Sequence, residues 1–335
     1  MLEKIEMKGF KCFVDQALDL RALNILSGLN SSGKSTVIQA LRLLHHRNPL
    51  PDYGPPSDLV SAHAQEFSLA VQVGKERITL AHTQYQDLVA WGDFDSLPPY
   101  FSFISAARLG PESSLPLSLD YDLPHVGVKG EYVLDFLSRY EELKGIPEPL
   151  RHTLARGGAV RLNVRSWLNE ITPGVEFESH LDRKSDRGRA EYSTRRPANV
   201  GFGLSYTMPV IANVLVYAAL LATGKTDQAL IMIENPEAHL HPAGQTKMGE
   251  FLARAAACGV QCVVETHSDH LLNGIRIAVK NGVLPAKGIA CYLFAYDFDQ
   301  DVAEVSSPLL DDQGMFDEWP EGFFDEAERN LERLL

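Results

Sequence analysis

Eight residues near the N-terminus have the types and spacing that could hold a phosphate group. They read Gly28-Leu29-Asn30-Ser31-Ser32-Gly33-Lys34-Ser35 and fit the P-loop pattern G-x-x-x-x-G-K-[ST]. The glycines let the backbone bring its N–H groups close to phosphate oxygens, and the lysine supplies a compact positive charge. The Ser35 hydroxyl is the kind of oxygen ligand that Mg²⁺ takes. We therefore expect ATP to be bound by Asn30, Ser31, Ser32, Gly33, Lys34, Ser35 and Thr36, with Ser35 on Mg²⁺.

The flanks of this loop have the pattern that the motif requires. Leu23–Leu26 is a short apolar run that predicts a buried strand, and Thr36–His45 predicts a helix with its apolar side chains on one face. The N-terminal end of such a helix attracts anions. The alternative is a Gly/Ser turn that matches the pattern by chance.

A second group of polar residues follows the apolar run Ala229–Ile233. Such a run ending in a carboxylate is the Walker B arrangement, in which the carboxylate holds Mg²⁺ and a second one polarises the attacking water. Glu234 suits the metal role, and Glu237 is the nearest candidate for the catalytic base. The alternative is a turn at a strand end, formed by Asn235 and Pro236.

Two further motifs could act at the same edge of the sheet. The apolar run Val260–Val264 delivers His267, which could hydrogen-bond the γ-phosphate or the attacking water. Two glycines and Ser205 open a helix over 205–222, and such a helix start can contact an anion through its N–H groups. The alternatives are a structural histidine and an N-capped helix with no ligand.

Composition limits the class of protein. The chain has 335 residues, 45% of them hydrophobic and 22% charged, with a net charge of -13. This charge repels nucleic acid as a whole, although the basic segment Arg183–Arg196 could bind it locally. The N-terminus is no signal peptide, and the longest apolar run, Val210–Ala222, is shorter than a membrane span needs. With four scattered cysteines, we expect a cytoplasmic protein without a membrane segment.

The order of the elements predicts an α/β fold of the P-loop NTPase class, with a mixed central sheet, N-terminal antiparallel strands and a small helical lobe. We divide the chain into an N-terminal half of the core at 1–111, a lobe at 112–198, a C-terminal half at 199–298 and an acidic tail at 299–335. Helices are expected in the lobe over Glu131–Leu143, Glu148–Arg156 and Val164–Ile171.

Taken together, these motifs resemble ABC-type ATPase heads of the RecF/SMC/OLD-like group. The nearest resemblance is to small bacterial AAA-family ATPases with the motifs E-N-P-E-A-H-L-H-P, here Glu234–Pro242, and E-T-H-S, here Glu265–Ser268. Those proteins also carry a short C-terminal segment of unknown function, which the tail Gly314–Asp325 resembles.

The resemblance implies a mechanism. Two heads would enclose two ATP molecules, so that Ser205 in the signature helix of one head acts in trans on the nucleotide of the other. Arg108 stands near the position of the family's Q-loop, and His267 corresponds to the switch histidine. Relatives of this type work with a separate effector such as a nuclease, and some act in DNA maintenance or in defence against phage and plasmids.

The chain departs from the ABC pattern at three points. Asn235 stands where the family has the catalytic glutamate, so either Glu237 takes over as base or ATP serves as a slowly hydrolysed clamp. Tyr206 is bulky where the signature has glycine, and the long coiled-coil arm is missing. The hypotheses are an ATPase that dimerises on ATP and regulates an effector, an ATP-dependent DNA-binding protein of the recombination-mediator type, and a non-hydrolysing assembly module.

Overall fold

The computed structural model describes residues 1–47, 53–118, 124–174, 176–193, 195–319, 324 and 326–334. The chain forms two compact units. The first unit comprises Met1–Pro99, Ala286–Asp311 and Met315–Leu335, and the second comprises Tyr100–Pro285 and Asp312–Gly314. The four segments expected from the sequence remain a prediction.

The first unit begins with an antiparallel sheet, as expected. Its strands lie in the order β2-β1-β4-β5-β6. Alternate residues of β1, among them Ile5 and Met7, are fully buried, which is typical of a sheet with one face on a core. The bounds are Lys4–Phe10 for β1, Phe13–Asp19 for β2, Phe67–Val73 for β4, Glu76–Thr83 for β5 and Gln86–Trp91 for β6.

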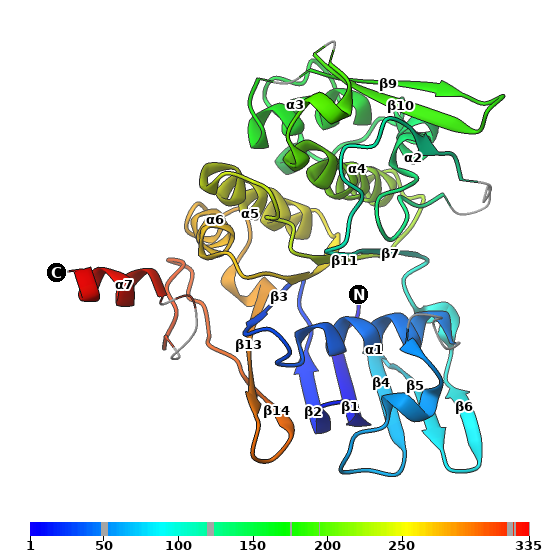
Figure 1. Ribbon diagram of the computed structural model, residues 1–335, viewed down its shortest axis with the longest axis vertical. Helices are drawn as coiled ribbons and strands as arrows, with labels where there is room; N and C mark the ends of the chain where they lie inside the picture. Colours follow the sequence, from blue (N-terminus) through cyan, green and yellow to red (C-terminus); the bar gives the residue numbers. More distant parts are fainter. Residues whose placement is uncertain are drawn as a thin grey trace. The chain divides into compact units, whose positions relative to one another are not determined.

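The strand before the P-loop lies in the same unit. This strand, β3 (Leu23–Gly28), pairs in parallel with β13 (Ile289–Asp297), which pairs antiparallel with β14 (Val302–Ser306). The helix α1 (Lys34–His46) follows β3 and packs against β3 and β4 (Figure 1). The expected strand, loop and helix are therefore confirmed. The last helix, α7, spans Glu326–Leu334.

The second unit contains three parallel strands covered by helices. Strand β11 (Ala229–Glu234) lies between β7 (Tyr100–Ile104) and β12 (Gln261–Glu265). The helix α4 (Phe202–Ala222) packs against β7 and β11, while α5 (Pro242–Ala257) packs against β12 and α6 (Asp269–Lys280). Together with the mixed pairing of β3, β13 and β14, this confirms the predicted α/β class.

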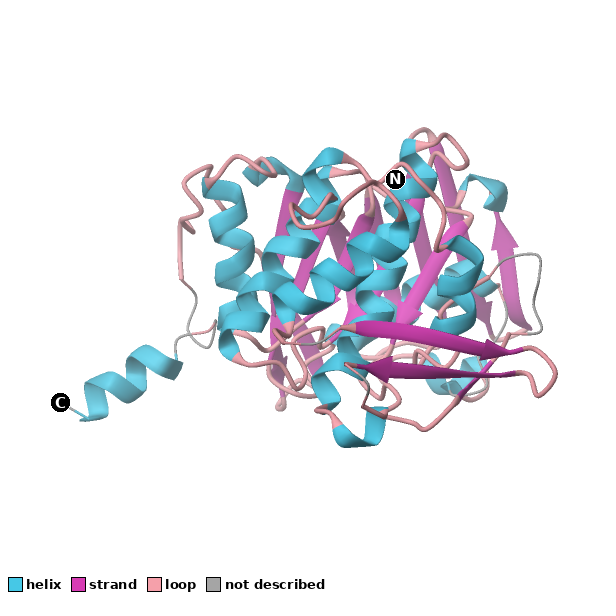
Figure 2. Ribbon diagram, turned by 90° about the horizontal axis from the view of Figure 1, so that it is seen from above, coloured by secondary structure: helices cyan, strands magenta, loops and turns pink. Residues whose placement is uncertain are grey.

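The lobe of the second unit is partly helical and partly a small sheet. It holds α2 (Val133–Tyr140), α3 (Val160–Ile171) and the sheet β8-β10-β9, whose strands are Leu115–Pro116, Arg187–Tyr192 and Phe177–Asp182. Figure 2 shows β9 and β10 as a long two-stranded ribbon. The basic segment Arg183–Arg196 therefore contains the turn and second strand of a hairpin.

The prediction of a helix over Glu148–Arg156 is wrong, since only a short 3-10 turn forms there, at Glu148–Leu150. Side chains of α3 bond the backbone of this segment instead. The N–H of His152 donates to Asn163 Oδ1 at 2.9 Å, and the Trp167 indole donates to the Leu150 carbonyl at 2.8 Å. The other short 3-10 turns within the described residues are Pro56–Leu59, Phe94–Ser96, Pro197–Asn199 and Ala286–Gly288.

Helix α4 is the one element among the described residues that is long and apolar enough to cross a membrane. Its most apolar 18-residue window is 83% buried inside the protein, as in the core helix of a globular fold. One of its buried polar residues, Asn213, donates a hydrogen bond to the Ser102 hydroxyl of β7 at 2.5 Å.

Candidate functional site

Two glycines allow the backbone of the P-loop to turn. Gly28 ends β3 with φ of 137°, and a Cβ there would meet the Phe294 carbonyl oxygen of β13 at 2.1 Å. Gly33 has φ of 105°, and a Cβ there would meet Cys12 Sγ at 2.9 Å. Residues with a Cβ rarely adopt such φ values, so both glycines are required by conformation and by space.

The charged end of Lys34 is held inside the loop. This side chain is 3% exposed, and its ammonium donates to the carbonyl oxygens of Gly28 at 3.0 Å and Leu29 at 2.6 Å. The Ser32 hydroxyl is buried and has no hydrogen-bond partner within the described part of the chain. A buried hydroxyl needs such a partner, and a phosphate oxygen would supply it. The loop therefore fits a nucleotide phosphate.

The other residues predicted to bind nucleotide lie along the same loop. Asn30 and Ser31 are exposed, and Ser35 is half-buried in the first turn of α1, which carries no acidic residue. Thr36 is buried, and its hydroxyl accepts a hydrogen bond from the half-buried Cys12 thiol at 3.6 Å. The helix end thus presents its N–H groups without a competing carboxylate.

In the second unit, Glu234 ends β11 and is oriented by the loop after β7. Its Oε2 accepts hydrogen bonds from the Ala106 N–H at 2.9 Å and from the Ser105 hydroxyl at 3.3 Å. No cluster of three or more His, Cys, Asp or Glu side chains that could hold a metal occurs within the described residues. These residues therefore do not form a metal site that consists of protein ligands alone. A single oriented carboxylate does fit Mg²⁺, which is commonly held by one or two protein ligands together with substrate phosphates and water.

The carboxyl group of Glu237 is buried at 9% exposure and only half hydrogen-bonded. Its Oε1 accepts from the His267 N–H at 3.0 Å, whereas its Oε2 is buried without a hydrogen-bond partner in the described structure. Burial raises the pKa of Glu237, whereas the His267 N–H, the Glu237 N–H, the Thr266 hydroxyl and the Arg108 charge act in the opposite direction. A carboxylate with a raised pKa and an unused oxygen can accept a proton from water.

The turn between these two glutamates depends on a left-handed residue. Asn235 has φ of 45°, and its N–H donates to the Glu265 carbonyl of β12 at 2.8 Å. Asparagine adopts this conformation more readily than most residues with a side chain. Asn235 thus has a structural reason to stand where the ABC pattern has a glutamate, which the sequence did not indicate.

The other two predicted side chains lie within the second unit as well. His267 follows β12 with an exposed side chain, and Ser268 caps α6 by accepting the Leu271 N–H at 3.0 Å. Ser205 is half-buried in the first turn of α4 and lines a small cavity with Tyr192 and Met208. The backbone N–H of His267 is therefore hydrogen-bonded to Glu237 directly, whereas Ser205 lies on a separate helix, α4.

Arg108 is bonded to the backbone at the end of β11. It is 4% exposed, and its Nη2 donates to the carbonyl oxygens of Glu234, at 3.1 Å, and Asn235. Burial lowers the pKa of Arg108 to about 10, so the side chain stays charged at neutral pH. Its guanidinium carbon lies 5.1 Å from the centre of the Tyr206 ring. Tyr206 was not expected among the site residues, although its bulk at a glycine position of the signature was a signal.

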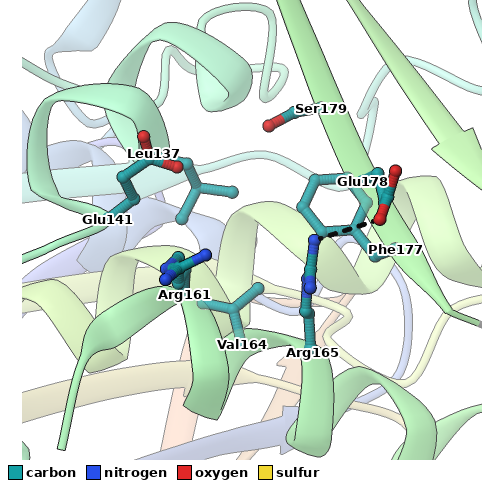
Figure 3. A pocket seen from close by; sticks show the side chains of 8 residues that line it. All are labelled: Leu137, Glu141, Arg161, Val164, Arg165, Phe177, Glu178 and Ser179. Carbon is teal, nitrogen blue, oxygen red and sulfur yellow. Dashed lines mark ion pairs between the residues drawn. The ribbon is translucent and has the colours of Figure 1, made fainter.

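A separate cavity of about 170 Å³ lies in the lobe between α2, α3 and β9 (Figure 3). Leu137, Val164 and Phe177 give it an apolar lining, and the ion pair of Arg165 with Glu178, at 3.5 Å, stands at its edge. None of the predicted site residues lines this cavity.

Comparison with known proteins agrees with the fold and the motifs. Residues 1–89 and 190–272 match the model of the AAA ATPase domain, and residues 287–334 match a family described as a protein of unknown function (DUF3696). No curated protein matches the chain.

Solved structures resemble the chain over nearly its whole length. An SMC head bound to the C-winged helix domain of ScpA is 13% identical, with 92% of this chain and 98% of that chain covered and a TM-score of 0.57. An Smc head with an extended coiled coil, bound to the C-terminal domain of ScpA from Pyrococcus furiosus, is 14% identical, with 99% of each chain covered and a TM-score of 0.58. The recombination mediator protein RecF is 12% identical, with 91% and 98% covered and a TM-score of 0.50. At these identities the likeness shows the fold alone.

Proposed function

Because the chain belongs to the AAA ATPase domain family, we propose that it hydrolyses ATP with Mg²⁺, dimerises around the bound nucleotide and thereby regulates a separate effector protein. The effector would act in DNA maintenance or in defence against phage and plasmids, inside the cytoplasm. The four cysteines, Cys12, Cys258, Cys262 and Cys291, are free thiols, which fits a reducing compartment.

The observation that carries the hydrolysis step is the half-bonded carboxyl of Glu237. In this proposal Glu237 Oε2 takes the proton of the attacking water, while Glu234 and Ser35 hold Mg²⁺. Lys34 supplies charge to the β- and γ-phosphates, and His267 contacts the γ-phosphate. Bound Mg²⁺ would neutralise the charge that develops on the phosphates.

The proposal of a dimer rests on the resemblance to ABC-type heads, in which two heads enclose two ATP molecules. In the proposal, Ser205 and the N–H groups at the start of α4 act on the nucleotide held by the partner's P-loop. The similar SMC heads were solved bound to domains of ScpA, which supports a partner protein for this fold but not its identity.

Steady-state release of phosphate from ATP tests the proposal. Wild-type protein should release phosphate, and Lys34→Ala should abolish both release and ATP binding. The exposed Glu66→Gln variant is a control for surface substitution and should keep the wild-type rate. ATP bound by the wild type without phosphate release would favour the non-hydrolysing clamp. An unchanged rate in Lys34→Ala would show that the activity belongs to another site or to a contaminant.

ATP-dependent DNA binding is the alternative, and the hairpin β9–β10 is its candidate surface. Arg189 and Arg196 line a groove of about 460 Å³ there, together with His180 and Glu191. His180 and Glu191 lie 3.5 Å apart as a potential ion pair, so the groove is of mixed charge.

Salt dependence distinguishes a DNA surface from a solvated hairpin. A DNA-binding hairpin should give duplex affinity that falls steeply with salt, and neutralising Arg195 and Arg196 should remove that dependence. Flat salt dependence in the wild type would eliminate this alternative.

A further inference from the structure

The aromatic ring of Tyr206 connects the first turn of α4 to the turn after β11. Its centre lies 5.1 Å from the guanidinium carbon of Arg108. It also packs edge-to-face with the His239 ring, with ring centres 4.6 Å apart and planes at 77°. All three residues belong to the second unit.

The guanidinium of Arg108 has few hydrogen-bond partners. Its Nη2 donates to the Glu234 and Asn235 carbonyls, whereas its Nε and Nη1 are buried with no hydrogen-bond partner within the described residues. An aromatic face attracts a cation most strongly when the cation is shielded from water, as Arg108 is at 4% exposure. The Tyr206 ring is therefore one of the few interactions of this charge, beside the Glu237 and Glu234 carboxylates.

The backbone of α4 is also close to the same turn. A Cβ at Gly203 would lie 2.9 Å from the His239 carbonyl oxygen, so the helix start and the turn have almost no space between them. A shift of the helix start would be passed to the turn by both contacts, because close-packed groups cannot move independently.

We propose that Tyr206 is a positioning residue that fixes Arg108 and, through the two carbonyls that Arg108 holds, the turn that orients Glu237. The start of α4 and the base are then linked within one head. The inference rests on the proposed function, since Glu237 must act as the base for the link to affect the rate. The inference gives a role to the bulky side chain of Tyr206. The glycine that the ABC signature has at this position would only let a second head approach more closely.

The rate test compares side chains of different chemistry at one position. Tyr206→Phe keeps the aromatic face, whereas Tyr206→Leu keeps apolar bulk and removes that face. We expect Tyr206→Phe to stay near the wild-type kcat, and Tyr206→Leu to lower kcat about tenfold or more with a KM for ATP within about threefold, as for an interaction needed only in the transition state. An unchanged or higher kcat in Tyr206→Leu would overturn the proposal.

Phe202→Ala is the matched control on the same helix turn. The Phe202 ring lies 5.2 Å from the His239 ring and 6.3 Å from the Tyr206 ring. Among the described residues, Tyr206 is the only aromatic ring in cation–π contact with Arg108. Phe202→Ala should therefore keep kcat. If it lowers kcat as much as Tyr206→Leu does, the effect comes from packing of the helix start and the link through Arg108 is refuted.

A readout independent of hydrolysis keeps the two proposals distinguishable. The Nε–H proton of Arg108 should show a ring-current shift in the NMR spectrum, assigned by its disappearance in Arg108→Lys. We expect the shift to persist in Tyr206→Phe and to be lost in Tyr206→Leu. A shift that persists in Tyr206→Leu would overturn the inference. If the wild type released no phosphate, the proposed function would fail, while this shift would still decide whether Tyr206 fixes Arg108.

Discussion

Replacing Glu237 by glutamine tests the base while keeping the shape of the site. The glutamine carbonyl can still accept the His267 N–H that now bonds Glu237 Oε1 at 3.0 Å, so the turn should stay in place. The variant cannot take a proton from water. Because general-base catalysis contributes about 10²- to 10⁴-fold, we expect kcat for phosphate release to fall by about that factor with ATP affinity unchanged.

The same substitution has an expected effect on stability. Burial raises the pKa of Glu237 above 4.5 in the folded protein, so the folded state binds this proton more tightly than the unfolded state does. Ionising the carboxyl therefore costs stability, and the cost grows as pH rises through the folded pKa. Urea unfolding should show Glu237→Gln to be at least as stable as the wild type at pH 7, with a smaller advantage at pH 4.5.

Two results would refute this reasoning. A kcat in Glu237→Gln within about twofold of wild type would be too small a loss for a general base, and Glu237 would then not be the catalytic base. A variant less stable than wild type at pH 7, with the difference closing at lower pH, would contradict the direction of the pKa shift. The Glu66→Gln variant controls for the loss of one negative charge.

Two other predictions concern the first unit of the chain. Gly33→Ala should lower the free energy of unfolding by about 2–5 kcal/mol, because φ of 105° strains alanine and the added Cβ would lie 2.9 Å from Cys12 Sγ. A loss below about 0.5 kcal/mol, measured by urea titration, would contradict this prediction. Glu6→Gln should cost at most about 1 kcal/mol at pH 7, since its partner Arg77 is exposed. The Arg77 hydrogen bonds lower the pKa of Glu6 to about 2, so this stabilisation is present above pH 4.5 and lost as pH falls toward 2. A difference between wild type and Glu6→Gln that does not change with pH would refute that assignment.

Much of the nucleotide-binding frame could be predicted because its signals are local. The glycines of the loop Gly28–Ser35 directly indicate a backbone that turns tightly. The apolar patterns on either side of the loop predict a strand before it and a helix after it. Helix α1 begins at Lys34, two residues before the expected Thr36, because the loop motif itself supplies the first helical turn. The apolar strand β11 ends at Glu234, one residue beyond the expected run.

The rest depends on contacts between distant parts of the sequence. Arg108 bonds carbonyls that lie 126 and 127 positions away, and no local pattern indicates such a pairing. The expected helix over Glu148–Arg156 failed for the same reason, since Asn163 and Trp167 of α3 bond that backbone. The unused oxygen of Glu237 is likewise a property of burial, which periodicity does not reveal for a turn residue.

The mass of the particle in solution tests the central claim most directly. We predict that Glu237→Gln with ATP and Mg²⁺ has the mass of two chains by light scattering, and that it has the mass of one chain without nucleotide. Lys34→Ala should stay at the mass of one chain under both conditions. A particle whose mass does not change with ATP, or a Lys34→Ala variant that dimerises as the parent does, would contradict the account.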